Sequence, residues 1–305
     1  MIQSFSSQID SGELLELQIR GVSNYAPLMV INVEGLGAPD GRINSVESPN
    51  LHGSTVNSTK ATQRFITMAL LVQGVDVVGD QARKELYKFF PVAKKISFGV
   101  KTDTRDVTID MWVESNPMKM FSKKENTEIK LVSENPWFRS VSKEVITFSG
   151  SIPLFEFPFS NESLVEPLIV FGEELSYISQ DVVYDGDVET GVEIELFIAG
   201  DVSGTINLYN PAYGQSLEID CSVLESILGG PLTIGDSIHI STVVGKKSLT
   251  LTRNGISYNA LHSLNMHPDW ITLYPGVNTI VYDATTGSDN LQFSMSYYSL
   301  YQGVV

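Results

Sequence analysis

The chain has 305 residues, of which 42% are hydrophobic and 18% are charged, and its formal net charge is −16 at pH 7. This length and apolar content predict two folded domains and exclude an extensively disordered chain. The single cysteine, Cys221, excludes an internal disulfide and a multi-cysteine metal site, and no apolar run approaches the ~20 residues of a membrane span, so we expect no membrane insertion.

Short apolar strands and glycine-rich turns alternate at the start of the chain. The segments that read as strands are Ile2–Phe5, Leu14–Arg20 and Leu28–Val33. The next segment, Gly35–Gly41, is too rich in glycine for regular structure. A phosphate-binding loop would need a Gly-Lys-Ser/Thr ending and a following helix, both missing here, so we interpret this segment as a surface loop.

A polar stretch precedes an apolar one between Pro49 and Val72. Residues 51–60 are small and polar, whereas 65–72 are almost entirely apolar. This contrast is typical of an extended hairpin that packs on another subunit, although an exposed loop that enters a core strand explains it equally well. For the hairpin, the candidate interface residues are His52, Val56, Phe65, Met68 and Leu70.

One amphipathic helix is predicted over Gly79–Pro91. Asp80 can cap its start, and Pro91 ends it because proline cannot continue a helix. The residues that fall on one stripe at helical spacing are Ala82, Leu86, Phe89 and Phe90. We expect this stripe to pack in the core and not against a cofactor.

Two alternating runs follow the helix. In Val107–Val113 the apolar side chains recur at every second position, which predicts a strand with one buried face. Thr127–Val132 repeats the pattern, and the corner Asn135–Phe138 ends it. We interpret these runs as a long hairpin that closes the first domain.

The second half reads as a sandwich of short strands separated by turns. The first strands expected there are Leu168–Phe171, Glu193–Ile198, Gly204–Tyr209 and Leu217–Cys221, and the last is Leu291–Leu300. Asn254-Gly255 predicts a tight hairpin, since both residues tolerate positive φ.

The two halves differ in charge. Lys+Arg and Asp+Glu number 17 each up to Phe148, against 3 and 19 from Ser149 onward. Such an acidic half disfavours specific nucleic-acid binding.

The sequence shows no catalytic or cofactor motif. The four histidines (His52, His239, His262 and His267) lack zinc-ligand spacing, and no serine lies in a nucleophile elbow. A calcium site could use the carboxylates of Asp181, Asp185 and Asp187 as ligands, but the twelve-residue calcium-binding loop motif is absent. We therefore expect no cofactor, no metal and no enzymatic activity.

Three features together resemble the distal tail protein family of long-tailed phages, whose members form the ring that ends the tail tube. The first is the tract Val107–Val113 that leads through Glu128–Leu131 to Asn135–Phe138. The second is the single short helix of the first half. The third is Leu273–Ile280 followed by Phe293–Gly303.

The resemblance implies a mainly β protein with two β-sandwich domains. Residues 1–148 would form the ring domain, with one short helix and an extended hairpin, and residues 149–305 an acidic galectin-like domain. Family likeness further implies a homo-hexamer, assembled in the host cytoplasm and placed at the virion tail tip. It would join the tail tube protein to the tail-associated hub protein and dock receptor-binding or side-fibre proteins.

A competing interpretation is a carbohydrate-binding module that assists host attachment through exposed aromatic side chains. Its candidates are Tyr209, Tyr213 and Trp270, which are also candidates for protein docking. The sugar-binding motif of galectins is absent, because His262 is followed by Ser263-Leu264-Asn265 and the only arginine of the second half is Arg253. A glycan hydrolase is a third interpretation, with no motif in its favour.

Overall fold

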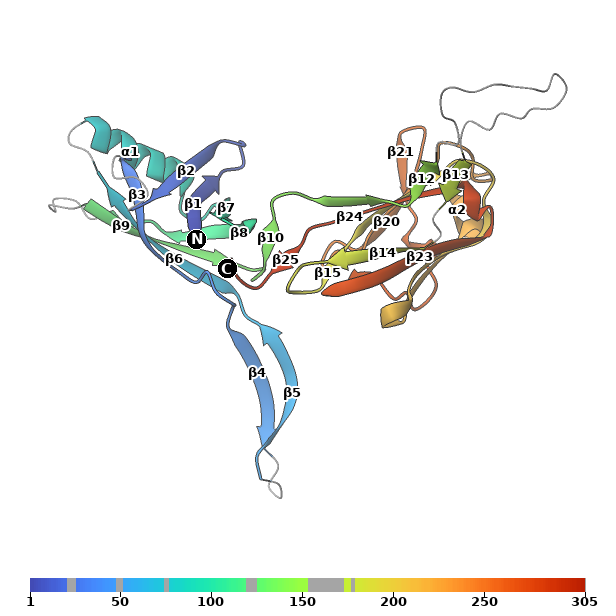
Figure 1. Ribbon diagram of the computed structural model, residues 1–305, viewed down its shortest axis with the longest axis horizontal. Coiled ribbons are helices and arrows are strands. Elements are labelled where there is room, and N and C mark those ends of the chain that lie inside the picture. The colour runs from blue at the N-terminus through green and yellow to red at the C-terminus, as the bar shows by residue number, and fades with distance from the viewer. Residues whose placement is uncertain are drawn as a thin grey trace. The chain divides into compact units, whose positions relative to one another are not determined.

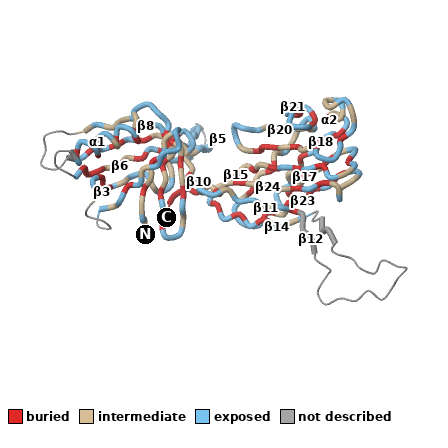
Figure 2. Tube along the Cα trace, turned by 90° about the horizontal axis from the view of Figure 1, so that it is seen from above, coloured by how far each residue is buried: buried red, intermediate tan, exposed pale blue. Residues whose placement is uncertain are grey.

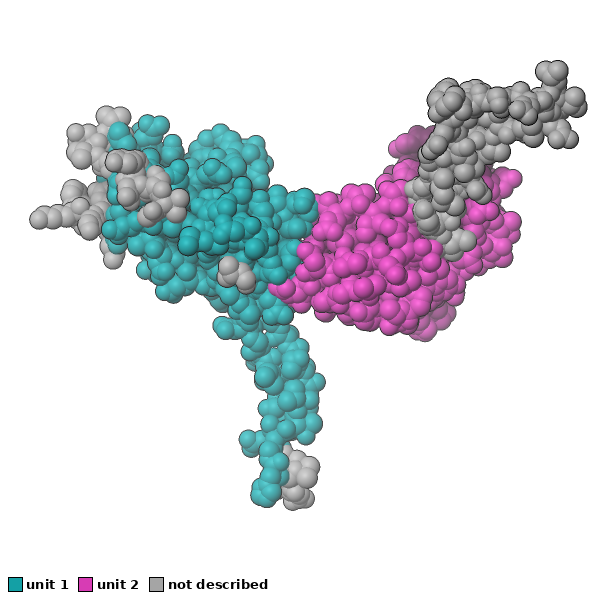
Figure 3. Space-filling view, in the orientation of Figure 1, with its two compact units in different colours: residues 1–142, 300–305 teal, residues 143–299 magenta. Residues whose placement is uncertain are grey.

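The computed structural model describes residues 1–20, 26–47, 52–73, 77–118, 125–152, 173–176 and 179–304. The chain divides into two compact units, coloured separately in Figure 3. Unit 1 is Met1–Ser142 with Leu300–Val305, and unit 2 is Lys143–Ser299. Unit 2 is therefore inserted into unit 1. This division differs from the predicted domains 1–148 and 149–305, because the C-terminal residues return to pair with unit 1.

Unit 1 contains β1 (Ile2–Gln8), β2 (Leu14–Ile19), β3 (Leu28–Glu34), β4 (Gly41–Glu47), β5 (Ser54–Ala61), β6 (Arg64–Val72), α1 (Val77–Phe89), β7 (Lys95–Thr102), β8 (Asp106–Ser115), β9 (Glu125–Ser133), β10 (Phe138–Ser140) and β25 (Leu300–Tyr301). Its main sheet has the order β25-β10-β8-β7-β1-β2-β3-β6-β9, and β9 also pairs with β8. The sheet thus closes on itself, which removes most of its free edges. Only β2 and β3 pair in parallel within the described sheet.

The core of unit 1 follows the predicted periodicities. In β8 the residues Val107, Ile109, Met111 and Val113 are buried while their neighbours are not, which confirms the predicted strand. Figure 2 shows this alternation along the strands. The predicted helix is confirmed as α1, and its stripe (Ala82, Leu86, Phe89 and Phe90) is buried in the same cluster as the strands.

Unit 2 contains β11 (Glu144–Thr147), β12 (Ser149–Ile152), β13 (Glu173–Ser176), β14 (Ser179–Tyr184), β15 (Thr190–Gly191), β16 (Glu193–Ile198), β17 (Ser203–Asn210), β18 (Gln215–Asp220), α2 (Cys221–Leu228), β19 (Ser237–Ser241), β20 (Ser248–Arg253), β21 (Ile256–Asn259), β22 (Thr272–Leu273), β23 (Gly276–Thr286) and β24 (Leu291–Tyr297). Three single 3₁₀ turns, Pro211–Tyr213, Leu261–Ser263 and Ser288–Asn290, connect some of these strands.

Two antiparallel sheets enclose the core of unit 2, with the orders β11-β24-β16-β19-β20-β21 and β14-β23-β17-β18. Aromatic rings fill the space between them. Phe148 meets Phe293 edge to face at 4.4 Å between centroids, and Phe293 stacks on Tyr282 at 5.2 Å. The mainly β fold and the sandwich are thus confirmed, while the finer likeness to galectins stays a prediction.

Local sequence signals succeeded at one turn and failed at one helix. The Asn254-Gly255 hairpin is confirmed, with φ of 54° and 77° between β20 and β21. Cys221, predicted to end a strand, instead begins α2, whose first turn is capped because the Ser222 amide donates to Asp220 Oδ1 at 2.8 Å. The predicted strand Leu168–Phe171 lies outside the described residues.

Candidate assembly surfaces

β4 and β5 form an arm that projects from the main sheet of unit 1 (Figure 1). Every residue of the two strands is exposed except Ala61, which is half-buried. A two-stranded hairpin without a core of its own is only marginally stable in water. We therefore expect contact with another molecule to stabilise the arm.

The predicted hairpin is present, but its strands differ from the expected ones. The expected segment, Pro49–Val72, joins β5 to β6, and β6 belongs to the main sheet. The true partner of β5 is β4, which contains only two aliphatic residues, Ile43 and Val46, among polar ones. A strand with no buried face carries no alternating pattern, so its sequence did not reveal it.

The arm exposes apolar side chains and unpaired cations. Ser45 pairs with Val56, and Ile43 lies two residues from Ser45 on β4, so Ile43 and Val56 share a face; they are 66% and 55% exposed. Arg42 lies directly opposite Lys60. Like charges in that position repel each other, and within the described chain neither has an ion-pair partner. A complementary surface would be apolar and acidic.

Arg64 fixes the root of the arm. This residue is only 3% exposed, and its guanidinium donates to four backbone carbonyls, each at 2.6 Å: those of Gly35, Gly37, Pro136 and Gln302. Its Cζ lies 4.5 Å from the centre of the Phe138 ring. Burial lowers the Arg64 pKa to about 10, so the group stays charged at neutral pH. One side chain thus connects the loop that leads to the arm, the β9–β10 corner and the C-terminal segment.

The C-terminal segment has further anchors on unit 1. Arg105 Cζ lies 4.2 Å from the centre of the Tyr301 ring, and Arg105 Nη1 donates to the Gly303 carbonyl at 3.2 Å. Val304 is fully buried, and its amide donates to the Leu36 carbonyl at 3.1 Å. These contacts explain why the last residues belong to unit 1.

An apolar row crosses the outward face of the main sheet beside the arm. Phe65 pairs with Val132, and Val132 pairs with Trp112, so the three side chains lie on one face across β6, β9 and β8. Phe65 is 58% exposed and Trp112 40%. The row is thus open to contact with another molecule.

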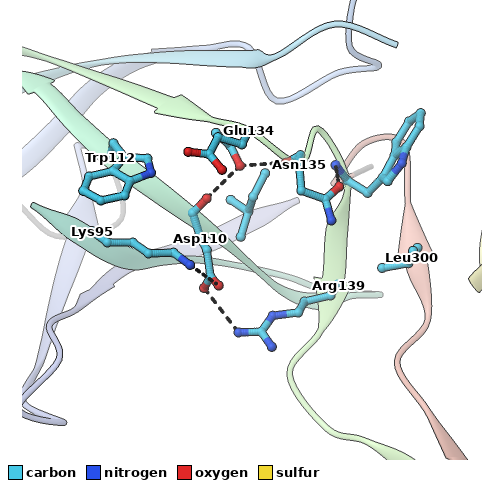
Figure 4. Close-up of a pocket in the computed structure, with 10 residues that line it drawn as sticks. Lys95, Asp110, Trp112, Glu134, Asn135, Arg139 and Leu300 are labelled. Atoms are coloured by element: carbon cyan, nitrogen blue, oxygen red, sulfur yellow. Dashed lines mark hydrogen bonds and ion pairs between the residues drawn. The ribbon is translucent and has the colours of Figure 1, made fainter. Parts of the chain in front are cut away.

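A pocket of about 190 Å³ adjoins the row at Trp112 (Figure 4). Among its lining residues, Asp110 pairs with Lys95 Nζ at 3.2 Å and with Arg139 Nη2 at 3.3 Å, and Glu134 is a second carboxylate. Asp110 is thus shared by two cations. This arrangement indicates no particular ligand, and we assign the pocket no chemistry.

The predicted interface residues do not lie together on one surface. His52 lies exposed in the turn that enters β5, Val56 is exposed on the arm, and Phe65 is exposed in the apolar row. Met68 and Leu70 are fully buried in the core of unit 1 and are inaccessible to another molecule. Sequence reasoning missed Ile43, Arg42 and Lys60, for which the only available signal was a cluster of polar β-compatible residues.

The predicted docking aromatics of unit 2 differ in their surroundings. Tyr209 points outward from β17 and is half-buried, and Tyr213 is 42% exposed and stacks on Tyr274 at 4.2 Å between centroids. Trp270 packs against the core, and Lys247 Nζ lies 5.1 Å from the centre of its ring. Trp270 is thus partly engaged within its own unit.

The described residues contain no group of three or more His, Cys, Asp or Glu side chains that could hold a metal ion. Asp181 instead accepts from Thr279 Oγ1 at 2.7 Å, and Asp185 from Ser299 Oγ at 2.9 Å. Across the same described ranges, no helix combines the length and apolarity needed to cross a membrane.

Cys221 is expected to be inert in the folded protein. Burial, with smaller contributions from Glu225 and Asp220, raises the pKa of its thiol to about 11 from an ordinary 9.0. The reactive thiolate is then about 100-fold scarcer below pH 9. Iodoacetamide labelling at pH 8, followed by mass spectrometry, should be slow for the native chain and fast in denaturant. Equal rates in both would contradict this environment.

Comparison with known proteins identifies solved structures that share this architecture. No protein-family model matches the sequence, and no curated protein matches it significantly. The crystal structure of the Dit protein (gp 19.1) of phage SPP1, described as a paradigm of the hub adsorption apparatus in phages that infect Gram-positive bacteria, aligns with a TM-score of 0.62 and 10% identity. That alignment covers 96% of this chain and 98% of the SPP1 chain. A chain from the baseplate of phage P2 in its activated conformation aligns with a TM-score of 0.47 and 11% identity, over 97% of this chain and 98% of that one. This chain therefore has the fold of the SPP1 Dit protein, which confirms at the level of fold the resemblance seen in the sequence.

Proposed function

We propose that this protein is a structural component of a phage tail tip or baseplate, a distal tail protein. Six copies would close a ring that joins the tail tube protein to the tail-associated hub protein. Unit 2 would dock receptor-binding or side-fibre proteins. The protein would assemble in the host cytoplasm and act in the virion, without a reaction, a cofactor, membrane insertion or specific nucleic-acid binding.

The observation that carries this proposal is the fold likeness to SPP1 Dit over both units. The arm supports the ring in particular. A closed ring of identical subunits needs two different complementary patches on each copy. The arm, with Ile43, Val56, Arg42 and Lys60, supplies one patch. The outward apolar row at Phe65, close to exposed carboxylates such as Glu134, is a candidate for the other.

The absence of a catalytic motif in the sequence agrees with a structural role. The carbohydrate-binding alternative gains no support from a particular contact, because Trp270 is packed in its own unit and Tyr213 is stacked on Tyr274. We therefore propose no sugar site on these residues.

Ring formation can be tested by light scattering and negative-stain imaging of the purified chain. We expect particles with the mass of six chains. The double variant Arg42→Glu/Lys60→Glu should lower the association constant by at least about 100-fold, because removal of two interface charge pairs costs about 3 kcal/mol or more. Its melting temperature as a monomer should not change, since the arm contributes no core residue.

The matched control is Lys246→Glu/Lys247→Glu, which changes the net charge by the same amount in a turn of unit 2. This control should assemble like the parent. The proposal would be contradicted if the ring formed with Arg42→Glu/Lys60→Glu but not with the control variant. It would also be contradicted if the chain were found in assembled particles away from the far end of the tail tube.

A further inference from the structure

The four-stranded sheet of unit 2 turns one face to solvent. On β14 and β23 the pair Val183 and Val277 is 70% and 55% exposed. Further along the same face, Val281 of β23 pairs with Tyr209 of β17. On this face the polar pair Asp181 and Thr279 lies between the two apolar pairs, and no layer covers the face among the described residues.

Carboxylates lie among and beside these apolar side chains. The pairing of Asp283 with Asn207, and of Asn207 with Glu218, places the two acids on the outward face on either side of β17. Asp181 lies on the same face of β14, two residues from Val183. Burial, with smaller contributions from the charges of Asp283 and Glu218, raises the pKa of the Tyr209 hydroxyl.

No positive charge balances these acids on the sheet. The four strands β14, β17, β18 and β23 contain no lysine or arginine. The four basic residues of unit 2 lie on or beside the other sheet: Lys143 precedes β11 and pairs with Glu193 of β16, Lys246 and Lys247 lie between β19 and β20, and Arg253 of β20 pairs with Asp236. The strands of the four-stranded sheet thus carry acidic charges and no basic ones.

The number and the spacing of the acids favour a basic protein over a metal ion as the ligand. Asp283 and Glu218 lie on strands separated by β17, so their Cα atoms are about 10 Å apart. A calcium ion takes six to eight oxygen ligands, and the described residues contain no group of three or more His, Cys, Asp or Glu side chains that could hold a metal ion. Arginine or lysine side chains spaced along another protein can reach both, and a guanidinium can also stack on Tyr209.

We propose that the outward face of β14, β23, β17 and β18 docks a basic protein partner. Its cationic side chains would pair with Asp283 and Glu218 around Tyr209, and its aliphatic side chains would cover Val183 and Val277. This inference rests on the proposed function, because it names the surface of unit 2 that receives another tail protein and the chemistry of that protein.

The test uses the full-length chain and a defined probe, the peptide Ac-Arg-Val-Arg-Val-Arg-NH2, titrated by calorimetry at low and at high salt. We expect saturable binding that weakens with salt. Glu218→Gln/Asp283→Asn should weaken it at least about tenfold, since each lost charge-assisted contact costs about 1.4 kcal/mol or more. Tyr209→Ala should weaken binding by a similar factor, which a purely long-range charge effect would not produce.

The matched control is Glu189→Gln/Glu195→Gln, which removes the same charge from exposed positions outside this sheet. It should retain the parent affinity within about twofold. Equal loss in the control, indifference to Tyr209→Ala, or the absence of binding at low salt would each overturn the inference. Ring formation does not enter this measurement, so the docking face can fail while the proposed ring stands, and the reverse also holds.

Discussion

Unit 1 separated from the C-terminal segment is expected to lose most of its stability. Two shortened chains test this. Both join Ser142 through a short Gly-Asn-Gly turn to residues 300–305, but the second also carries Tyr301→Ser and Val304→Ser. The first should fold, because Phe138 pairs with Tyr301 and Arg139 with Leu300, so a tight turn can replace unit 2. The second should be less stable by about 4 kcal/mol or more, through lost burial and orphaned donors.

Urea denaturation followed by circular dichroism gives the two free energies of unfolding. Since a domain of this size has only about 5–15 kcal/mol in total, such a loss should leave the second chain partly unfolded at 25 °C. The fragment 1–148, which follows the predicted domain boundary and lacks the segment altogether, should behave like the second chain. Equal stability of all three would show that the returning segment is dispensable.

Substitution of Arg64 is expected to have the next largest effect. Arg64→Ala leaves the four carbonyls of its cluster without their donor, and we expect a loss of about 3–5 kcal/mol in unfolding free energy. Arg64→Lys should recover only part of this, because a lysine cannot reach four acceptors or stack on Phe138 as a planar group. Chemical denaturation of each full-length variant measures the loss.

The control for Arg64 is Arg20→Ala. Arg20 lies at the surface directly after β2, and its replacement should change the free energy by less than about 0.5 kcal/mol. Hydrogen exchange adds a second measure, because in Arg64→Ala the amides near Leu36 and Val304 should lose protection together. If the Arg64 hydrogen bonds did not stabilise the protein, Arg64→Ala would lower neither the free energy of unfolding nor the protection of these amides.

Local patterns in the sequence predicted those elements whose own residues contain the signal. The alternation in β8 and the stripe of α1 specify which face is buried, and Asn254-Gly255 specifies its turn through the φ angles that these residues tolerate. Each of these depends on neighbours within a few positions. The charge difference between the halves likewise needs no tertiary information.

β6 shows where hydropathy misleads. Strand alternation places Ile66, Met68 and Leu70 on one face, so Arg64 must point inward with them and Phe65 outward. Judged one residue at a time, Phe65 belongs in the core and Arg64 on the surface. The observed arrangement is stable because four carbonyls from distant segments converge on the guanidinium, and no window of sequence contains that information.

By itself, the sequence determined the β-rich composition, the amphipathic helix, the tight hairpin and the acidic second half, because short-range periodicity and charge are properties of neighbouring residues. Only the tertiary structure decided that the C-terminal residues return to unit 1, that β4 and not β6 pairs with β5 in the arm, and that Asp181, Glu218 and Asp283 share the outward face of one sheet. Those outcomes depend on strand pairing between residues far apart in the chain, and the free energy of such pairing is set by surfaces that exist only after folding.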